Sequence, residues 1–448
     1  MTDGPRHDPA DLTATEALAA MAAGGLTAAD LAEACLARIA AREPEIQAFT
    51  HVDAEGARRA AAGLDRHRRA GLPVGPLHGL PVGVKDIIDV EGMPCERGTP
   101  LEAGHRARAD ASVVRRLRAA GAIVIGKTVT TELAAYPPSK TRNPHDVTRT
   151  PGGSSSGSAA AVAAGMIPLA IGTQTNGSVV RPASFCGTVG FKPSYGAIAR
   201  SGVMPFAPAT DTVGLLARSV EDVALLEHLT GPDGQDPDAL PHILPLAATA
   251  MAEPPLTPVL GFFEGPAWGE AEPWLAEAFN ELLAAVPGTV HIATPSALAA
   301  TAVTLRALMT AEGAHHLGHY LDRDRAQVHP ILAEMFDEGR QLPATDYLTA
   351  RAAQPRLRAA LAEAFEEVDA LVTPAAPGEA PGRESTGSPA FCSLWSLTGL
   401  PAITLPLLAG PGGLPVGVQL VGPHGDDARL LRTARWLVTH LAQAGETP

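Results

Sequence analysis

The chain has 448 residues, which is enough for two or three average domains or for one large α/β domain. Its formal net charge of −14 argues against an electrostatic interaction with nucleic acid or with an anionic membrane. The four cysteines form no C-x-x-C pair, so neither a zinc site nor a disulfide framework is expected. A signal-peptide pattern is not visible, and no apolar run reaches the roughly 18 residues of a membrane helix, so we expect a cytoplasmic protein.

The first part of the chain alternates helical and strand patterns. Residues 13–42 read as two helices, broken at Gly24 and Gly25, with Thr27 as the N-cap of the second. Residues 79–90 have the alternating pattern of a strand or hairpin. An amphipathic helix at 111–122 and a short buried strand at 122–127 follow, which is typical of a layered α/β protein.

The rest of the chain is organised around a stretch rich in Gly, Ser, Ala and Thr at 151–200. A Pro-rich surface excursion is expected at 232–256, and residues 270–370 read as mainly helical, with 357–368 as a clear example. Strand 413–421 and a final helix at about 427–442 close the sequence. Because strand patterns lie on both sides of the small-residue stretch, we expect a single domain over 1–448, with a helical N-terminal segment at about 13–45 and a mainly helical insertion at about 240–370.

Two serine-containing turns are candidates for chemistry. The first, PGGSSSGSAAAVAAG at 151–165, has glycines that allow close backbone approach and then three hydroxyls; alone it is compatible with a phosphate cradle or with a structural turn. The second, GTQTNGSVVRPASFCG at 172–187, places Ser178 on a tight turn where backbone N–H groups can converge on an oxyanion. It has no G-x-S-x-G elbow, which excludes the α/β-hydrolase interpretation.

A base for Ser178 is the missing element, and Lys85 is the candidate. Its neighbours Val82, Val84, Ile87 and Ile88 are apolar and can desolvate the amine, which lowers a lysine pKa. Only four of the 34 basic residues are lysines, and all four lie between positions 85 and 192. That confinement is compatible with chance or with the need for an amine that can lose its proton.

The motifs PVGVKD and PGGSSSGSAAAVAAG, with a serine 24 residues after the first loop serine, resemble those of the amidase signature family. The resemblance covers almost the full length, including the segments at 110–134, 185–196, 211–226 and 397–407. It implies one α/β/α layered domain around a large mixed central sheet, in which the 240–370 segment covers the substrate entrance. It implies no metal and no organic cofactor.

Carried over residue by residue, the resemblance makes Ser178 the nucleophile, Ser154 the bridging serine and Lys85 the ultimate base. In the family, the peptide bond that precedes the bridging serine, here from Gly153, is cis. The oxyanion hole is expected from the backbone amides of four consecutive residues: Thr175, Asn176, Gly177 and Ser178. Ser155 is expected to support the network with its hydroxyl. The remaining lysines are expected to make structural contacts (Lys127, Lys192) or to lie at the surface (Lys140).

The chain departs from the family pattern next to the nucleophile. Many members carry Asp at the position of Gln174, Gly at that of Asn176 and Arg at that of Val180, where this chain has Arg181 one residue later. Asn176 is interpreted first as a Gly substitute in a left-handed turn and second as a substrate contact. The substrate-pocket candidates are residues near the nucleophile or in segments that border the family's acyl pocket: Gln174, Arg181, Tyr136, Met204, Phe206 and Trp395. His315 and His316 lack acidic or Cys partners, so no metal site is expected.

The sequence therefore predicts a serine amidase that cleaves a small amide or ureido-type compound through an acyl-enzyme on Ser178. The alternative is the glutaminase (A) subunit of a tRNA-dependent amidotransferase; the changes at Gln174 and Val180 count against glutamine as substrate. A third hypothesis is a catalytically inactive scaffold, against which the intact Ser178, Ser154 and Lys85 argue. The expected partner is a small-molecule amide, without direct nucleic-acid or membrane contact, and a homodimer is an open expectation.

Overall fold

A large mixed sheet organises the computed structural model, which describes residues 8–241 and 246–445. In these ranges the sheet has 11 strands in the order β1-β3-β2-β4-β6-β5-β10-β11-β9-β7-β8. The strands are β1 (Phe49–Val52), β2 (Pro81–Lys85), β3 (Ile123–Thr128), β4 (Leu169–Gln174), β5 (Val189–Lys192), β6 (Thr212–Ala217), β7 (Leu260–Phe262), β8 (Val290–His291), β9 (Ala370–Pro374), β10 (Ala402–Ala409) and β11 (Pro415–Val421). Strands from both ends of the chain thus share one α/β fold.

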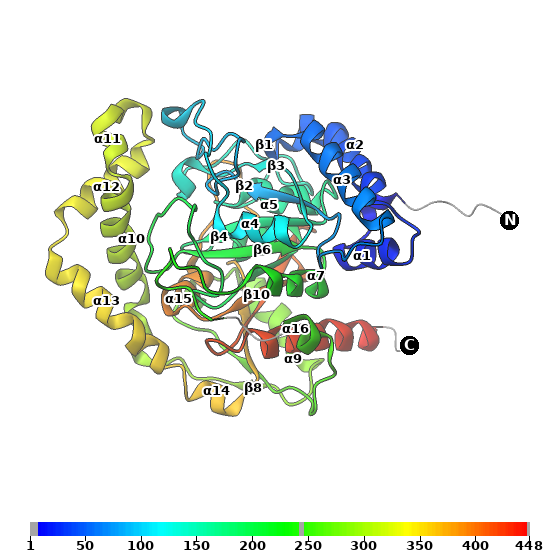
Figure 1. The fold of residues 1–448 in the computed structure, drawn as a ribbon. Helices are drawn as coiled ribbons and strands as arrows, with labels where there is room; N and C mark the ends of the chain where they lie inside the picture. Colours follow the sequence, from blue (N-terminus) through cyan, green and yellow to red (C-terminus); the bar gives the residue numbers. More distant parts are fainter. Residues whose placement is uncertain (1–7, 242–245, 446–448) are drawn as a thin grey trace.

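Helices surround this sheet (Figure 1). The α-helices are α1 (Ala14–Ala22), α2 (Ala28–Ile46), α3 (Ala54–Arg69), α4 (Ser112–Ala119), α5 (Ser156–Ala163), α6 (Val180–Cys186), α7 (Val220–Ala224), α8 (Leu246–Met251), α9 (Pro273–Ala284), α10 (Thr301–Leu317), α11 (His319–Asp324), α12 (Pro330–Gln341), α13 (Ala344–Ala359), α14 (Ala364–Glu367), α15 (Ala390–Thr398) and α16 (Asp427–Gly445). Helices α1 to α3 cover one side of the molecule, whereas α10 to α13 line the opposite side (Figure 1). None of the helices in the described ranges is long and apolar enough to cross a membrane.

The centre of the sheet brings the conspicuous sequence motifs to one edge. Strand β2 pairs in parallel with β4, with Val84 opposite Ile171, so the carboxyl ends of both strands meet at the same edge. Lys85 is the last residue of β2, and Gln174 is the last residue of β4. Side chains placed at this edge can therefore converge, as ligand-binding residues do in open α/β sheets.

Small residues allow helix α5 to approach the sheet closely. Every residue from Ser156 to Val162 is buried. A Cβ built on Gly157 would lie 2.1 Å from the carbonyl oxygen of Ala48 and 2.4 Å from the nitrogen of Val129. Because no side chain fits there, the Gly/Ser/Ala composition of this stretch follows from helix–sheet contact.

The N-terminal prediction is confirmed, because Thr27 caps α2 in a capping box with Asp30. The expected helix at 357–368 is interrupted, since α13 ends at Ala359 and α14 covers only Ala364–Glu367. The segment at 240–370 is not purely helical either, because its short strands β7 and β8 extend the central sheet. The strand prediction at 79–90 is too long: β2 ends at Lys85 and a turn follows.

Candidate active site

Lys85 lies at the carboxyl end of β2 with its side chain fully buried. Its Nζ donates to Ser154 Oγ at 2.7 Å and to Thr173 Oγ1 at 2.8 Å. Burial lowers the pKa of Lys85 well below that of an ordinary lysine, and the carboxylate of Asp211 partly offsets this effect. A neutral amine that contacts a hydroxyl can accept its proton.

Ser154 and Ser155 precede helix α5. The peptide bond between Gly153 and Ser154 is cis, as the family resemblance implies. The Ser155 hydroxyl donates to Thr173 O at 3.2 Å and accepts from Thr173 N at 3.3 Å, which joins the start of α5 to strand β4. Ser155 thus contacts the backbone of Thr173, whose side chain accepts from Lys85.

Ser178 lies in the loop between β4 and α6. A residue before it and a residue after it make hydrogen bonds to Lys85 or to the residue that precedes Ser154. Five residues before it, Thr173 accepts from Lys85; three residues after it, Arg181 Nη2 donates to Gly153 O at 2.6 Å. The Ser178 side chain is 8% exposed, and its hydroxyl has no protein hydrogen-bond partner in the described ranges. Its hydrogen bond with Ser154 is not formed in this structure.

Backbone donors are available beside Ser178. In the part of the chain that the structure describes, the N–H groups of Asn176, Gly177 and Ser178 have no protein acceptor. The next two N–H groups, of Val179 and Val180, both donate to Gln174 Oε1, at 2.9 and 3.0 Å. These N–H groups could therefore donate to an oxyanion near Ser178 without first breaking a hydrogen bond within the protein.

The structure gives Asn176 a different role from the one expected. Its φ is not positive, so the left-handed interpretation is wrong. Its side-chain oxygen accepts from Ser393 Oγ at 2.7 Å, and its backbone oxygen accepts from Ser396 Oγ. Asn176 therefore fastens the nucleophile loop to helix α15, and nothing in its sequence context signals these distant partners.

A cavity of about 180 Å³ opens beside this loop. Its lining includes Thr173 and Thr175 from the nucleophile strand and loop, together with the expected Met204 and Phe206. The other apolar lining residues are Ile87, Ala134, Val203, Pro205, Pro208 and Val213, and the charged ones are Arg200, Asp211 and Asp236. The exposed atoms of the wall are mostly apolar, and the cavity reaches the nucleophile loop at Thr175; Ser178, Ser154 and Lys85 are not among its lining residues.

The other four pocket candidates do not line this cavity. Gln174 is fully buried and donates to Ser396 Oγ at 3.0 Å. Arg181 donates to the backbone oxygens of Gly153 and Gly387, so its guanidinium is used inside the protein. Trp395 packs against Phe263 with ring centroids 5.6 Å apart, and Tyr136 contacts Met309 Sδ at 4.0 Å. These side chains turn inward or towards α10.

Two residues at the site were not identified from the sequence. Thr173 accepts from Lys85, and Asp211 lines the cavity and accepts from Thr175 Oγ1 at 2.5 Å. Asp211 begins the segment DTVGLLARSVEDVALL, which resembles the family, and this position could have marked Asp211 as a candidate site residue. Lys127 pairs with Asp86 at 3.0 Å, and Lys192 donates to the carbonyl oxygens of Pro193 and Leu400, so both have the structural contacts expected. No metal-binding group of three or more His, Cys, Asp or Glu occurs among the described residues.

Comparisons with known proteins give the family. The Amidase family model matches residues 30–431. The A subunit of glutamyl-tRNA(Gln) amidotransferase from Chloroflexus aurantiacus is 36% identical, over 94% of this chain and 95% of the relative. The fold is similar to that of a protein from a vestigial complex linked to the origins of an s-triazine catabolic enzyme, with a TM-score of 0.90, 31% identity and 96% and 98% of the two chains covered. It is also similar to peptide amidase from Stenotrophomonas maltophilia, with a TM-score of 0.82, 31% identity and 96% of each chain covered.

These findings correct one expectation. A small-molecule amide as the partner, without nucleic acid, does not agree with relatives that are subunits of an enzyme named for a tRNA substrate. The expectation was based on the net charge, which describes the whole surface and does not exclude a single interface. The family itself follows from the match across the chain: the protein belongs to the amidase signature family and is an amidase that acts on carbon–nitrogen bonds.

Proposed function

We propose that this chain hydrolyses a primary amide through an acyl-enzyme on Ser178, with Ser154 as the proton bridge and Lys85 as the base. The observation that carries the proposal is the 2.7 Å hydrogen bond between buried Lys85 and Ser154. As Ser178 Oγ attacks the amide carbon, its proton passes to Ser154 and from there towards Lys85. The proton returns to the leaving nitrogen, ammonia departs, and water then hydrolyses the ester.

The oxyanion of the tetrahedral intermediate is assigned to the backbone amides from Thr175 to Ser178. The free N–H groups of Asn176, Gly177 and Ser178 support this assignment. Their loop is fixed by Gln174 on one side and by Ser393 and Ser396 on the other. Hydrogen-bond donors that are already oriented before the reaction need little reorganisation energy in the transition state. Such loops therefore stabilise the developing negative charge.

For the amide donor, the first candidate is glutamine, with the chain working as the ammonia-releasing component of a larger amidotransferase. The 36% identity to the A subunit of glutamyl-tRNA(Gln) amidotransferase, over nearly the full length of both chains, supports it. This was the alternative interpretation of the sequence, and the relatives favour it over a lone small-amide hydrolase.

A second candidate, a small amide with an apolar acyl group, is supported by the cavity. The Arg200 guanidinium is engaged by Asp236, Asp238, Tyr195 and two backbone oxygens, and Arg181 by Gly153 and Gly387. Among the described residues that line the cavity, Arg200 is the only arginine or lysine, so no free cation awaits a substrate carboxylate. An apolar acyl group would fit this wall without an unpaired charge.

The test is ammonia release from L-glutamine and from a series of straight-chain aliphatic amides, with and without added amidotransferase partner subunits. We expect glutamine turnover that increases with the partners, and loss of activity in Ser178→Ala and Lys85→Met. Ser158→Ala is the matched control, because this buried α5 hydroxyl contacts Thr128 and Ile171 instead of Lys85. Turnover of the aliphatic amides alone would select the second candidate. Full activity of Ser178→Ala would contradict the proposed nucleophile.

A further inference from the structure

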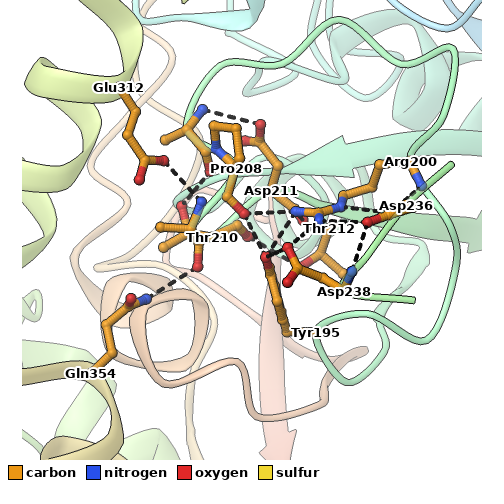
Figure 2. Close-up of polar contacts among 12 residues, drawn as sticks. Tyr195, Arg200, Pro208, Thr210, Asp211, Thr212, Asp236, Asp238, Glu312 and Gln354 are labelled. Atoms are coloured by element: carbon orange, nitrogen blue, oxygen red, sulfur yellow. Dashed lines mark hydrogen bonds and ion pairs between the residues drawn. The ribbon is translucent and has the colours of Figure 1, made fainter. Parts of the chain in front are cut away.

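The segment from Pro205 to Thr212 forms one wall of the cavity and is held from outside by two helices (Figure 2). Glu312 of α10 accepts from Ala209 N at 2.8 Å, and Gln354 of α13 donates to Ala209 O at 3.1 Å. Arg200 donates to Pro208 O at 2.6 Å. Hydrogen bonds therefore fix the backbone of this wall at two consecutive residues, Pro208 and Ala209.

On the inner side, one carboxylate joins the wall to the nucleophile loop. Asp211 Oδ1 accepts from Thr175 Oγ1 at 2.5 Å. Asp211 Oδ2 accepts from the backbone N–H groups of Phe206 and Ala207, at 2.8 and 3.0 Å. Thr175 begins the loop that leads to Ser178, and Phe206 lines the cavity, so Asp211 connects the reacting loop with the surface that faces the acyl group.

We propose that Asp211 is a positioning residue for amide hydrolysis, which fixes the oxyanion-binding loop at Thr175 against the cavity wall at Phe206. The inference rests on the proposed function, in which the amides from Thr175 to Ser178 bind the oxyanion. If Thr175 is released, the loop can shift relative to the acyl group, and small misplacements of reacting groups reduce rates strongly.

The charge of Asp211 provides an independent readout. This carboxylate raises the pKa of Lys85 against the larger, opposite effect of burial. The other charged groups near the site have partners of their own. Lys127 of β3 pairs with Asp86, which directly follows β2, and Arg200 pairs with Asp236. Glu312 accepts from Ala209 N and from Tyr347. Removal of the Asp211 charge should therefore change the titration of Lys85, whereas a purely structural defect should not.

Asp222 offers a matched control. It too is an aspartate that accepts from two backbone N–H groups, of Ala14 and Thr15, and from one threonine hydroxyl, of Thr15. Its donors belong to helix α1, away from the cavity. Asp211→Asn and Asp222→Asn thus lose comparable hydrogen bonds, but only the first lies beside the reacting groups.

The experiment measures kcat, KM and the pH profile of kcat/KM for ammonia release by the full chain, with its partner subunits where these are needed. For Asp211→Asn we expect kcat to fall about 10- to 100-fold, with a smaller change in KM. The acidic limb of its profile should move to lower pH, because the carboxylate that raises the pKa of Lys85 is lost. Asp222→Asn should lose thermal stability but keep the kcat and the acidic limb of the native protein.

Thr175→Val separates the hydrogen bond from the charge and keeps the test decisive if Asp211→Asn does not fold. It should lower kcat similarly while the acidic limb stays in place, because the Asp211 carboxylate remains. Native kcat in both Asp211→Asn and Thr175→Val, or an equal fall of kcat in Asp222→Asn, would overturn the inference. Ser178→Ala distinguishes this result from failure of the proposed function: if Ser178→Ala is inactive while Asp211→Asn is unaffected, only the positioning role is wrong.

Discussion

Lys85 and Thr173 are joined side chain to side chain at 2.8 Å, although they lie on different strands and 88 residues apart. The parallel pairing of β2 and β4 makes this contact possible, because it sets the carboxyl ends of the two strands side by side. The Thr173 hydroxyl shares Nζ of Lys85 with Ser154. It therefore helps to fix the direction in which the amine faces the bridging serine.

We predict that Thr173→Val lowers kcat about 10- to 100-fold with little change in KM, since the amine loses one of two side-chain acceptors that orient it. Thr173→Ser keeps the hydroxyl and should retain most of the activity. Steady-state kinetics of the two variants check this. Equal rates for Val and Ser would show that the hydroxyl does not orient Lys85.

The lowered pKa of Lys85 predicts a pH dependence of the reaction. The amine acts as a base only when it is neutral, so kcat/KM should be high above its lowered pKa and fall as the pH drops through that value. Lys85→Arg should be inactive at every pH, because a guanidinium does not lose its proton in proteins. Activity of Lys85→Arg at any pH would contradict the base role.

Lys192 is the control for this effect and makes its own prediction. Burial lowers its pKa to about 7, while its amine donates to backbone oxygens away from the cavity. The unfolded lysine holds its proton up to about pH 10, so between about pH 7 and 10 the unfolded state binds more protons and stability rises with pH. Urea unfolding across this range should show the rise, and Lys192→Met should remove that contribution. The acidic limb of kcat/KM should not move in Lys192→Met.

Arg181 provides a further prediction, because its contacts are those of a supporting residue. It donates to the oxygen of Gly153, directly before Ser154, and to that of Gly387. Arg181→Met should lower kcat and destabilise the fold by about 1–3 kcal/mol for each buried carbonyl that is left unpaired, with KM nearly unchanged. Arg218→Met is the matched control, since Arg218 also donates to backbone oxygens, of Ile167, Ala10 and Leu12. It should destabilise without lowering kcat; a raised KM in Arg181→Met alone would instead indicate substrate contact.

The last prediction concerns acyl-chain length. Phe206 lines the cavity and is 2% exposed, so Phe206→Leu should enlarge the cavity beside the nucleophile loop. In a series of aliphatic amides, kcat/KM should shift towards longer chains, by about 10-fold for an added methylene group that now fits. Phe191→Leu in β5 removes a similar volume from the core outside the cavity. An unchanged chain-length preference in Phe206→Leu would place the acyl group elsewhere.

The sequence was sufficient to predict features that depend on neighbouring residues or on the spacing of motifs along the chain. The apolar neighbours of Lys85 predicted its burial. The glycines of the small-residue stretch were interpreted as allowing close approach to a ligand, whereas Gly157 approaches the backbone of Ala48 and Val129. The Thr27 cap and the helix and strand at 111–127 follow from short-range pattern. These features depend on residues that are neighbours along the chain, so their periodicity and capping groups can be read directly.

The direction of each side chain near Ser178 was decided by tertiary structure. Gln174 and Arg181 are close to the nucleophile in sequence, yet both turn inward, because buried polar groups need partners. Gln174 accepts from the nearby Val179 and Val180 N–H groups and donates to the distant Ser396 hydroxyl. Arg181 donates to the carbonyl oxygens of Gly153 and Gly387. Thr173 and Asp211 gained their roles from parallel strand pairing and from a loop that packs across the site. A sequence records which donors and acceptors exist, whereas only the folded chain determines which of them meet, because hydrogen bonds form over about 3 Å between residues that can be more than 200 positions apart.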